Sequence, residues 1–120
     1  NWTGTIKTGS VVLTDLGKIA PAAGTQEKIN EYKAALLNGT KKVFDTSLFT
    51  VTSYEGGAYA ELTDVTMDEN KKLTSAKQNG IEVVKTVNGI TYFDESANRS
   101  APYFDINIEG IKLIQAEKKA

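Results

Sequence analysis

Residues 81–93 read IEVVKTVNGITYF, with two β-prone runs on either side of Asn88-Gly89. Asn-Gly between alternating apolar residues is the strongest short-range signal for a β-hairpin, because both residues tolerate the positive φ that a type I′ turn requires. We therefore expect antiparallel strands over residues 81–87 and 90–93, and a fold built around this pair.

The segments on either side of the hairpin carry weaker strand signals. Downstream, residues 102–109 alternate, and the predicted inward face consists of Phe104, Ile106 and Ile108. Upstream, residues 67–80 are polar and poorly periodic, so we expect a loop with at most one helical turn. Shorter strands are predicted over residues 2–7, 10–14, 42–44, 48–53 and 58–65, with a turn or bulge at Gly56-Gly57.

One helix is predicted, over residues 25–37. Thr25 is a plausible N-cap and Asn38-Gly39 is a good stop signal. The apolar stripe of this helix consists of Ile29, Tyr32, Leu36 and Leu37. With strands on both sides of the helix, the predicted class is α+β, a small strand-rich domain with one main helix.

Composition limits the function classes. The 120 residues carry a formal net charge of -1 and their lysines are scattered, so a nucleic-acid partner is not expected. The chain has no cysteine and no histidine, and therefore lacks the usual general base near neutral pH and the commonest metal ligand. We expect a binding protein and not an enzyme, with no cofactor. No window approaches the roughly 18–20 apolar residues of a membrane-spanning helix.

The acidic and aromatic residues also favour structural roles. Neighbours in a strand point to opposite faces, so the pairs Asp68-Glu69 and Asp94-Glu95 fit solvated turns better than acid–base catalysis. Asp64 with Asp68 and Glu69 lacks the glycine and the spacing of a calcium loop, and we expect no metal site. Four aromatic residues could stack on a base or a sugar, but half-buried aromatic residues on strands usually belong to the core, where we expect them: Trp2, Tyr54, Tyr59 and Tyr92.

Residues 4–13, GTIKTGSVVL, place one lysine just before a glycine turn. Gly9 has no Cβ and tolerates positive φ, so the backbone there can approach a ligand closely. Lys7 adds three hydrogen-bond donors at one point. The local pattern fits an exposed hairpin lysine as well as a ligand contact, and both interpretations stay open at this level.

Several short sequence segments, taken together in their order along the chain, indicate a family resemblance. They are residues 4–13 already quoted, the helix end Leu36-Leu37-Asn38-Gly39, FDTSLFTV at 44–51, YFDES at 92–96, RSAPYFDI at 99–106 and IEGI at 108–111. Together they resemble the C-terminal part of the basic-membrane-protein (BMP) family of substrate-binding lipoproteins. Ser10 stands where the family commonly has a second glycine.

This resemblance implies an extracytoplasmic, cell-surface receptor that feeds an ABC importer, most often with a purine nucleoside. Such receptors have two α/β lobes that close on the ligand. The chain would be their C-terminal portion, with the lipid anchor upstream of it and an ABC permease as partner. Residues 1–53 would end the binding-protein fold, and residues 54–120 would be a strand-rich extension. Lys7 would donate to the ligand, with Gly9 as its companion.

Two alternatives remain beside this resemblance. One is a stand-alone β-rich structural or adhesive module of a secreted or surface protein. The other is a small single-strand-binding β-barrel, against which the acidic balance and the scattered lysines argue. Because the chain starts at Asn1-Trp2-Thr3 without methionine, we expect a processed protein or a piece of a longer one.

Overall fold

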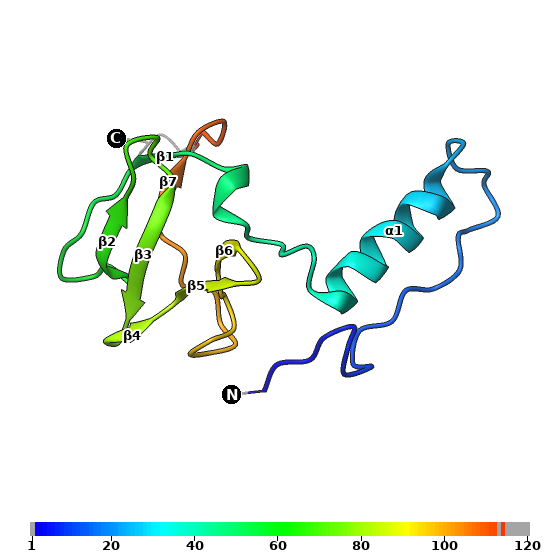
Figure 1. The fold of residues 1–120 in the computed structure, drawn as a ribbon, viewed down its shortest axis with the longest axis horizontal. Coiled ribbons are helices and arrows are strands. Elements are labelled where there is room, and N and C mark those ends of the chain that lie inside the picture. Colours follow the sequence, from blue (N-terminus) through cyan, green and yellow to red (C-terminus); the bar gives the residue numbers. More distant parts are fainter. Residues whose placement is uncertain (1, 113, 115–120) are drawn as a thin grey trace, which may run out of the picture.

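The computed structural model describes residues 2–112 and 114. Its elements in chain order are α1 (Thr25–Asn38), a 3-10 turn (Thr46–Leu48), β1 (Val51–Ser53), β2 (Thr63–Met67), β3 (Leu73–Gln78), β4 (Ile81–Glu82), β5 (Val84–Val87), β6 (Ile90–Phe93) and β7 (Asn107–Ile108). The strands form antiparallel sheets in the orders β2-β3-β4, β5-β6 and β1-β7. In the described part of the chain this is a small α+β domain with one α-helix, which confirms the predicted class. Figure 1 shows α1 standing apart from the sheets.

The hairpin predicted around Asn88-Gly89 is confirmed. Val84 pairs with Phe93 and Val87 with Ile90, and the two turn residues have φ of 51° and 77°. The first predicted strand is broken at Val83 into β4, which pairs with β3, and β5, which pairs with β6. Val83 and Val84 are both buried. Consecutive side chains of a straight strand point to opposite faces, so they cannot both enter one core. The break between β4 and β5 changes the direction of the backbone and allows both side chains to be buried.

The prediction of a loop over residues 67–80 is wrong, because β3 lies there and is the middle strand of its sheet. Leu73, Ala76 and Gln78 are buried along it, in a pattern that does not alternate strictly. The register between β2 and β3 shifts twice, and Asp64 within β2 has φ of 51°. A bulged strand of mostly polar residues shows neither the period of two nor the apolar content that sequence patterns detect.

The core surrounds Phe93. Its ring packs edge-to-face against Phe104 at 4.9 Å between centroids and tilted against Tyr103 at 5.4 Å. The other buried apolar residues are Val51, Leu62, Leu73, Ala76, Val83, Val84 and Ile106. The expectation that residues 102–109 form one alternating strand is wrong, because strand geometry is limited to β7 and Tyr103, on the predicted outer face, is buried. The Tyr103 hydroxyl donates to the Asp94 carbonyl at 2.7 Å, which draws this side chain inward.

The N-terminal strands predicted over residues 2–7 and 10–14 are absent from the described residues. The chain turns instead at residues 6–9, where the Gly9 N–H donates to the Ile6 carbonyl at 3.2 Å and the Ser10 N–H to the Thr5 carbonyl at 3.1 Å. The Thr5 N–H also donates to the Thr8 hydroxyl at 2.9 Å. Threonine hydroxyls that form hydrogen bonds with the nearby backbone compete with strand pairing. Among the described residues, no strand pairs with this segment and favours an extended backbone there.

The strands predicted over 42–44, 48–53 and 58–65 are shorter than expected or displaced. Residues 42–44 form no strand, and the Asp45 carboxylate accepts the Ser47 N–H at 2.9 Å and caps the 3-10 turn that follows. Strand β1 occupies only the last three residues of the second range, and β2 begins near the end of the third. Strand β1 pairs with β7, so the two predicted segments 1–53 and 54–120 meet in one sheet.

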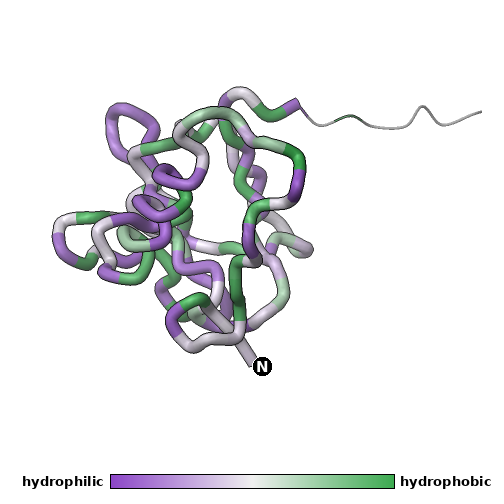
Figure 2. Tube along the Cα trace, turned by 90° about the vertical axis from the view of Figure 1, so that its right-hand side faces the viewer, coloured by the Kyte–Doolittle hydropathy of each residue, from purple (hydrophilic) through white to green (hydrophobic). Residues whose placement is uncertain are grey.

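Helix α1 lies within one residue of its predicted bounds. Gly24, with φ of 84°, occupies the N-cap position, and the Thr25 hydroxyl donates backwards to the Ala22 carbonyl, so the expected Thr25 cap is wrong. Gly39 ends the helix with φ of 79°, as predicted. None of its residues is buried. Figure 2 accordingly shows hydrophobic stretches on peripheral parts of the tube as well as at its centre.

The aromatic residues expected in the core behave differently from one another. Tyr54 packs against the core and its hydroxyl donates to the Leu62 carbonyl. Tyr92 is half-buried. Trp2, which is 74% exposed, and Tyr59, which is fully exposed, contradict the prediction. Both lie outside the described strands, where no sheet face covers an aromatic ring.

Candidate functional site

Lys7 and Gly9 lie on the turn of residues 6–9. Gly9 has φ of 78°, and a Cβ added there would meet no atom within 4 Å. Its role is therefore to supply a left-handed backbone and not to make room for a neighbouring group of the chain. The turn presents Lys7 with its side chain exposed.

Lys7 lines a groove of about 380 Å³. The groove is bounded by the N-terminal turn, the last turn of α1, the segment that follows this helix, and β6 with the residues after it. Its lining residues are Thr3, Thr5, Ile6, Lys7, Leu36, Leu37, Lys41, Lys42, Val43, Phe44, Tyr92, Asp94, Glu95 and Ser96. We call it the Lys7 groove. It brings together residues that are up to 93 positions apart in the sequence, from Thr3 to Ser96.

Two further lysines, Lys41 and Lys42, belong to the lining of this groove. The Lys42 ammonium lies 4.6 Å from the centre of the Tyr92 ring, and the Lys41 ammonium lies 4.6 Å from the centre of the Tyr32 ring. Each contact has the geometry of a cation–π interaction. The sequence presents Lys41-Lys42 only as one short basic pair. The clue to its placement is Gly39, because the helix stop turns the chain back and the Lys41 N–H donates to the Ala35 carbonyl at 3.2 Å.

The opposite side of the groove carries the acidic pair Asp94-Glu95. The Asp94 carboxylate accepts from the Lys85 ammonium at 2.8 Å, and this hydrogen bond raises the pKa of Lys85. Among the described residues no carboxylate lies within 4.0 Å of the ammonium groups of Lys7, Lys41 or Lys42. The groove therefore holds more free positive than negative charge.

A second, larger groove of about 640 Å³ runs between residues 13–17 and the face of α1 that carries Ile29, Tyr32 and Leu36. It contains the predicted apolar stripe of the helix. Leu13 and Leu16 line it from the other side and are themselves exposed. We call it the helix groove. Its walls combine these apolar side chains with the polar side chains of Thr14, Asp15, Gln26, Asn30 and Lys33.

Asp64 and Asp68, which the sequence places near each other as possible cation ligands, have structural partners. The Asp68 carboxylate accepts the Asn70 and Lys72 N–H groups, each at 2.9 Å, and closes the turn between β2 and β3. Asp64 pairs with Lys77 at 3.0 Å. Across residues 2–112 and 114, no three histidine, cysteine or acidic side chains gather as metal ligands.

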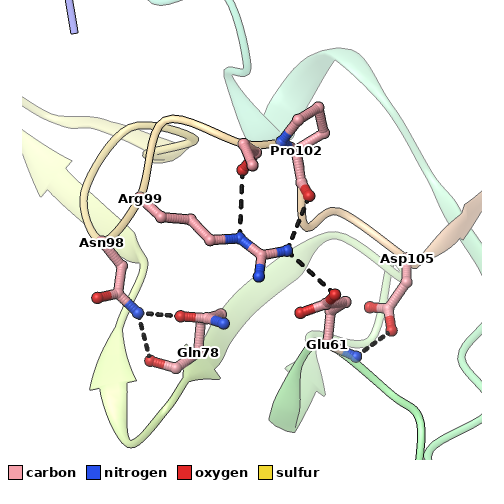
Figure 3. A network of polar contacts seen from close by, with 7 residues as sticks. Glu61, Gln78, Asn98, Arg99, Pro102 and Asp105 are labelled. Carbon is pink, nitrogen blue, oxygen red and sulfur yellow. Dashed lines mark hydrogen bonds and ion pairs between the residues drawn. The ribbon is translucent and has the colours of Figure 1, made fainter. Parts of the chain in front are cut away.

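Arg99 organises a network of polar contacts, which Figure 3 shows. Its guanidinium pairs with the Glu61 carboxylate at 3.0 Å and donates to the Pro102 carbonyl at 2.9 Å. The Glu61 N–H donates to the Asp105 carboxylate at 2.8 Å. Asn98 donates to the Gln78 carbonyl at 3.0 Å. These groups satisfy one another and hold residues 98–105 against the sheet of β2, β3 and β4.

Comparison of the chain with protein-family models, with curated proteins and with solved structures finds no match. Within the described residues, no helix has both the length and the apolar content that a bilayer crossing requires.

Proposed function

We propose that this chain is the C-terminal segment of an extracytoplasmic solute-binding lipoprotein that delivers a purine nucleoside to an ABC importer. The observation that carries the proposal is the position of Lys7 on a groove wall, beside aromatic side chains. In this proposal the chain binds and does not catalyse, needs no cofactor, and is held at the membrane through a lipid anchor upstream.

The chemistry of the Lys7 groove supports a nucleoside. Phe44 and Tyr92 offer ring surface for a flat base, and the hydroxyls of Thr3, Thr5 and Ser96 are suited to ribose oxygens. The Lys7 ammonium supplies a strong donor to a base or sugar acceptor. Small-molecule sites of this kind combine apolar walls with a few polar groups that fix the orientation of the ligand.

The exposed apolar surface of the first forty residues is the second support. Its exposed large side chains are Trp2, Val11, Val12, Leu13, Leu16, Ile19, Tyr32, Leu36 and Leu37. Large exposed apolar surface marks sites that a partner covers. In the proposal, the two lobes of the receptor cover it.

The isolated chain is expected to bind nucleosides weakly or not at all. The Lys7 groove is open, whereas nucleoside-sized ligands bury most of their surface between several walls. Isothermal titration calorimetry with guanosine, adenosine and inosine checks this expectation. A micromolar dissociation constant for the isolated chain would contradict the proposal that the other walls belong to missing lobes.

In the receptor that contains this chain, Lys7→Ala is expected to weaken nucleoside binding by about 1.5–3 kcal/mol, the range for a lost charged hydrogen bond. The matched control is Lys18→Ala, a lysine that lines neither groove. Calorimetry on both variants makes the comparison. Equal affinities of Lys7→Ala and the unsubstituted receptor would remove Lys7 from the site.

A stand-alone β-rich structural or adhesive module is the second candidate. It is favoured by one observation, that all the buried apolar residues of the described chain lie between Val51 and Ile106, so the sheets have a core of their own. The intact mass of the native protein separates the two candidates. A mature chain of 13.0 kDa would exclude a two-lobed receptor and favour the module.

A further inference from the structure

The charges in the Lys7 groove are not balanced by the chain itself. Three lysines line it, and of its two acidic residues Asp94 is already paired with Lys85 at 2.8 Å. Glu95 is the one remaining acidic side chain in the lining. Like charges gathered in a concave site raise the local concentration of counter-ions.

The three lysines differ from the paired lysines of the chain. Lys28, Lys77 and Lys85 each lie within 3.1 Å of a carboxylate oxygen. Lys41 and Lys42 instead contact ring faces, which leaves their N–H donors available. Their backbone is fixed by the bond from the Lys41 N–H to Ala35 and by the β-bridge between Asp45 and Tyr92.

We propose that the Lys7 groove binds the phosphate group of a small soluble ligand through Lys7, Lys41 and Lys42. Phosphate suits the site because lysine is a compact point charge that binds phosphate oxygens from many directions, and a dianion engages several ammonium groups at once. The hydroxyls of Thr3, Thr5 and Ser96 supply further donors. This inference goes beyond the proposed function, because it concerns a charged group in a groove of this chain alone.

The test is a titration of the isotope-labelled 120-residue chain with inorganic phosphate at low ionic strength, followed by NMR of the backbone amides. We expect saturable shifts at Lys7, Lys41, Lys42 and Tyr92. The double variant Lys41→Gln/Lys42→Gln is expected to raise the dissociation constant about tenfold, since each exposed charge contact contributes a few-fold. The control Lys18→Gln makes the same charge change outside the groove and is expected to shift the constant less than twofold.

Four results would overturn the inference. The first is the absence of saturable shifts in the groove. The second is an equal loss with Lys18→Gln, which would mean diffuse attraction by net charge. The third is a set of shifts of equal size with guanosine. Guanosine has no phosphate, so this result would mean that the ligand binds to the aromatic rings of the groove. The fourth is sedimentation of the chain with phosphatidylglycerol vesicles without a response to free phosphate, which would assign the lysines to a membrane surface.

The double variant is expected to keep the fold, because both lysines are only half-buried and neither belongs to the core. An unchanged dispersion of its amide spectrum and an unchanged melting temperature verify this before the titration. Lys42→Arg provides a second variant that keeps the charge. It is expected to retain the affinity for phosphate within about threefold, whereas a loss as large as that of Lys42→Gln would assign Lys42 a packing role and overturn the inference.

Discussion

At the scale of single residues, Phe93 has the largest consequence. It is the last residue of β6, is 1% exposed, and packs against aromatic rings from two other parts of the chain, Phe44 and the neighbours Tyr103 and Phe104. Its strand was predictable from the Asn88-Gly89 turn. Its partners were not, because the pairing of rings that are distant in the sequence depends on how the sheets pack.

Phe93→Ala is expected to lower the free energy of unfolding by about 3–5 kcal/mol, because it removes a fully buried ring and leaves a cavity. Urea denaturation followed by circular dichroism measures the change. Tyr59→Ala is the matched control, since that ring is fully exposed, and it is expected to change stability by less than about 0.5 kcal/mol. A loss below about 1 kcal/mol for Phe93→Ala would contradict a core centred on this ring.

Glu82 is the second residue with a large local role. Its carboxylate accepts from the Ser75 hydroxyl at 2.6 Å, the Ala76 N–H at 3.1 Å and the Val84 N–H at 3.0 Å, where β4 gives way to β5. Burial by itself would raise the pKa of Glu82, but these three hydrogen bonds together with Lys77 lower it.

The pH dependence follows from this direction. Because the pKa of Glu82 is lower in the folded chain than its unfolded value of about 4.3, the charge stabilises the fold above that pH, and the stabilisation is lost as the pH falls through the folded pKa. Glu82→Gln is expected to reduce stability at pH 7 and to flatten the loss of stability as the pH falls below the unfolded pKa. Thermal melts across this range measure the effect, with the exposed Glu27→Gln as control. Parallel pH profiles for Glu82→Gln and the unsubstituted chain would contradict the prediction.

At the scale of elements, the sequence predicts those whose signals are local. The hairpin of β5 and β6 depends on Asn88-Gly89, and α1 on an apolar period and the Gly39 stop. Strand β3 was missed because its residues are polar and its partner β2 is bulged, so its burial depends on neighbours that no local window contains.

The segment that returns to the sheet, residues 98–105, depends on Arg99. Arg99→Ala is expected to lower the free energy of unfolding by about 1–2 kcal/mol, because the guanidinium joins Glu61 to the Pro102 carbonyl and lies over the Tyr103 ring. Arg99→Lys is expected to recover less than half of the loss, since one ammonium cannot serve all these partners. The control is Lys28→Ala, which breaks an exposed pair within α1 and is expected to leave the stability nearly unchanged. Chemical denaturation of the three variants measures these changes in the free energy of unfolding. Full recovery of stability by Arg99→Lys would mean that only the charge of Arg99 matters, and it would contradict the role of the several contacts.

At the scale of the whole molecule, the chain has two unequal parts. Its radius of gyration is 17.6 Å, whereas a compact chain of this length has about 14 Å. All the buried residues among those described lie from Thr46 to Ile106, and α1 contributes none. The sheets hold a core, and the helix with the turn before it lies beside them.

Amide hydrogen exchange is expected to reveal this division. The amides of β3 should exchange only with global unfolding, whereas those of α1 should exchange at least about 100-fold faster, since little tertiary packing protects an exposed helix of this length. Mass spectrometry of peptic fragments measures both rates in one sample. Equal protection of the α1 and β3 amides from exchange would contradict the conclusion that α1 has no buried packing against the core.

The candidate site was only partly predictable. Residues 4–13 drew attention to Lys7, and the structure places that residue on a groove. Lys41, Lys42 and Tyr92 join it through the turn after α1 and the position of β6, both of which are tertiary features. Sequence patterns identify residue types suited to binding, but the residues that share one groove are fixed by how the elements pack.

The irregular strand β2 has a last consequence, for how molecules meet each other. It is the outer strand of its sheet, a place where an unpaired row of backbone groups invites a strand from another copy. The left-handed backbone of Asp64 and the register shifts on either side of Thr66 interrupt that row. An incoming strand would have to match this irregular backbone. The bulge in β2 made β3 hard to predict from the sequence. The same bulge protects this edge of the sheet against the addition of strands that leads to fibres.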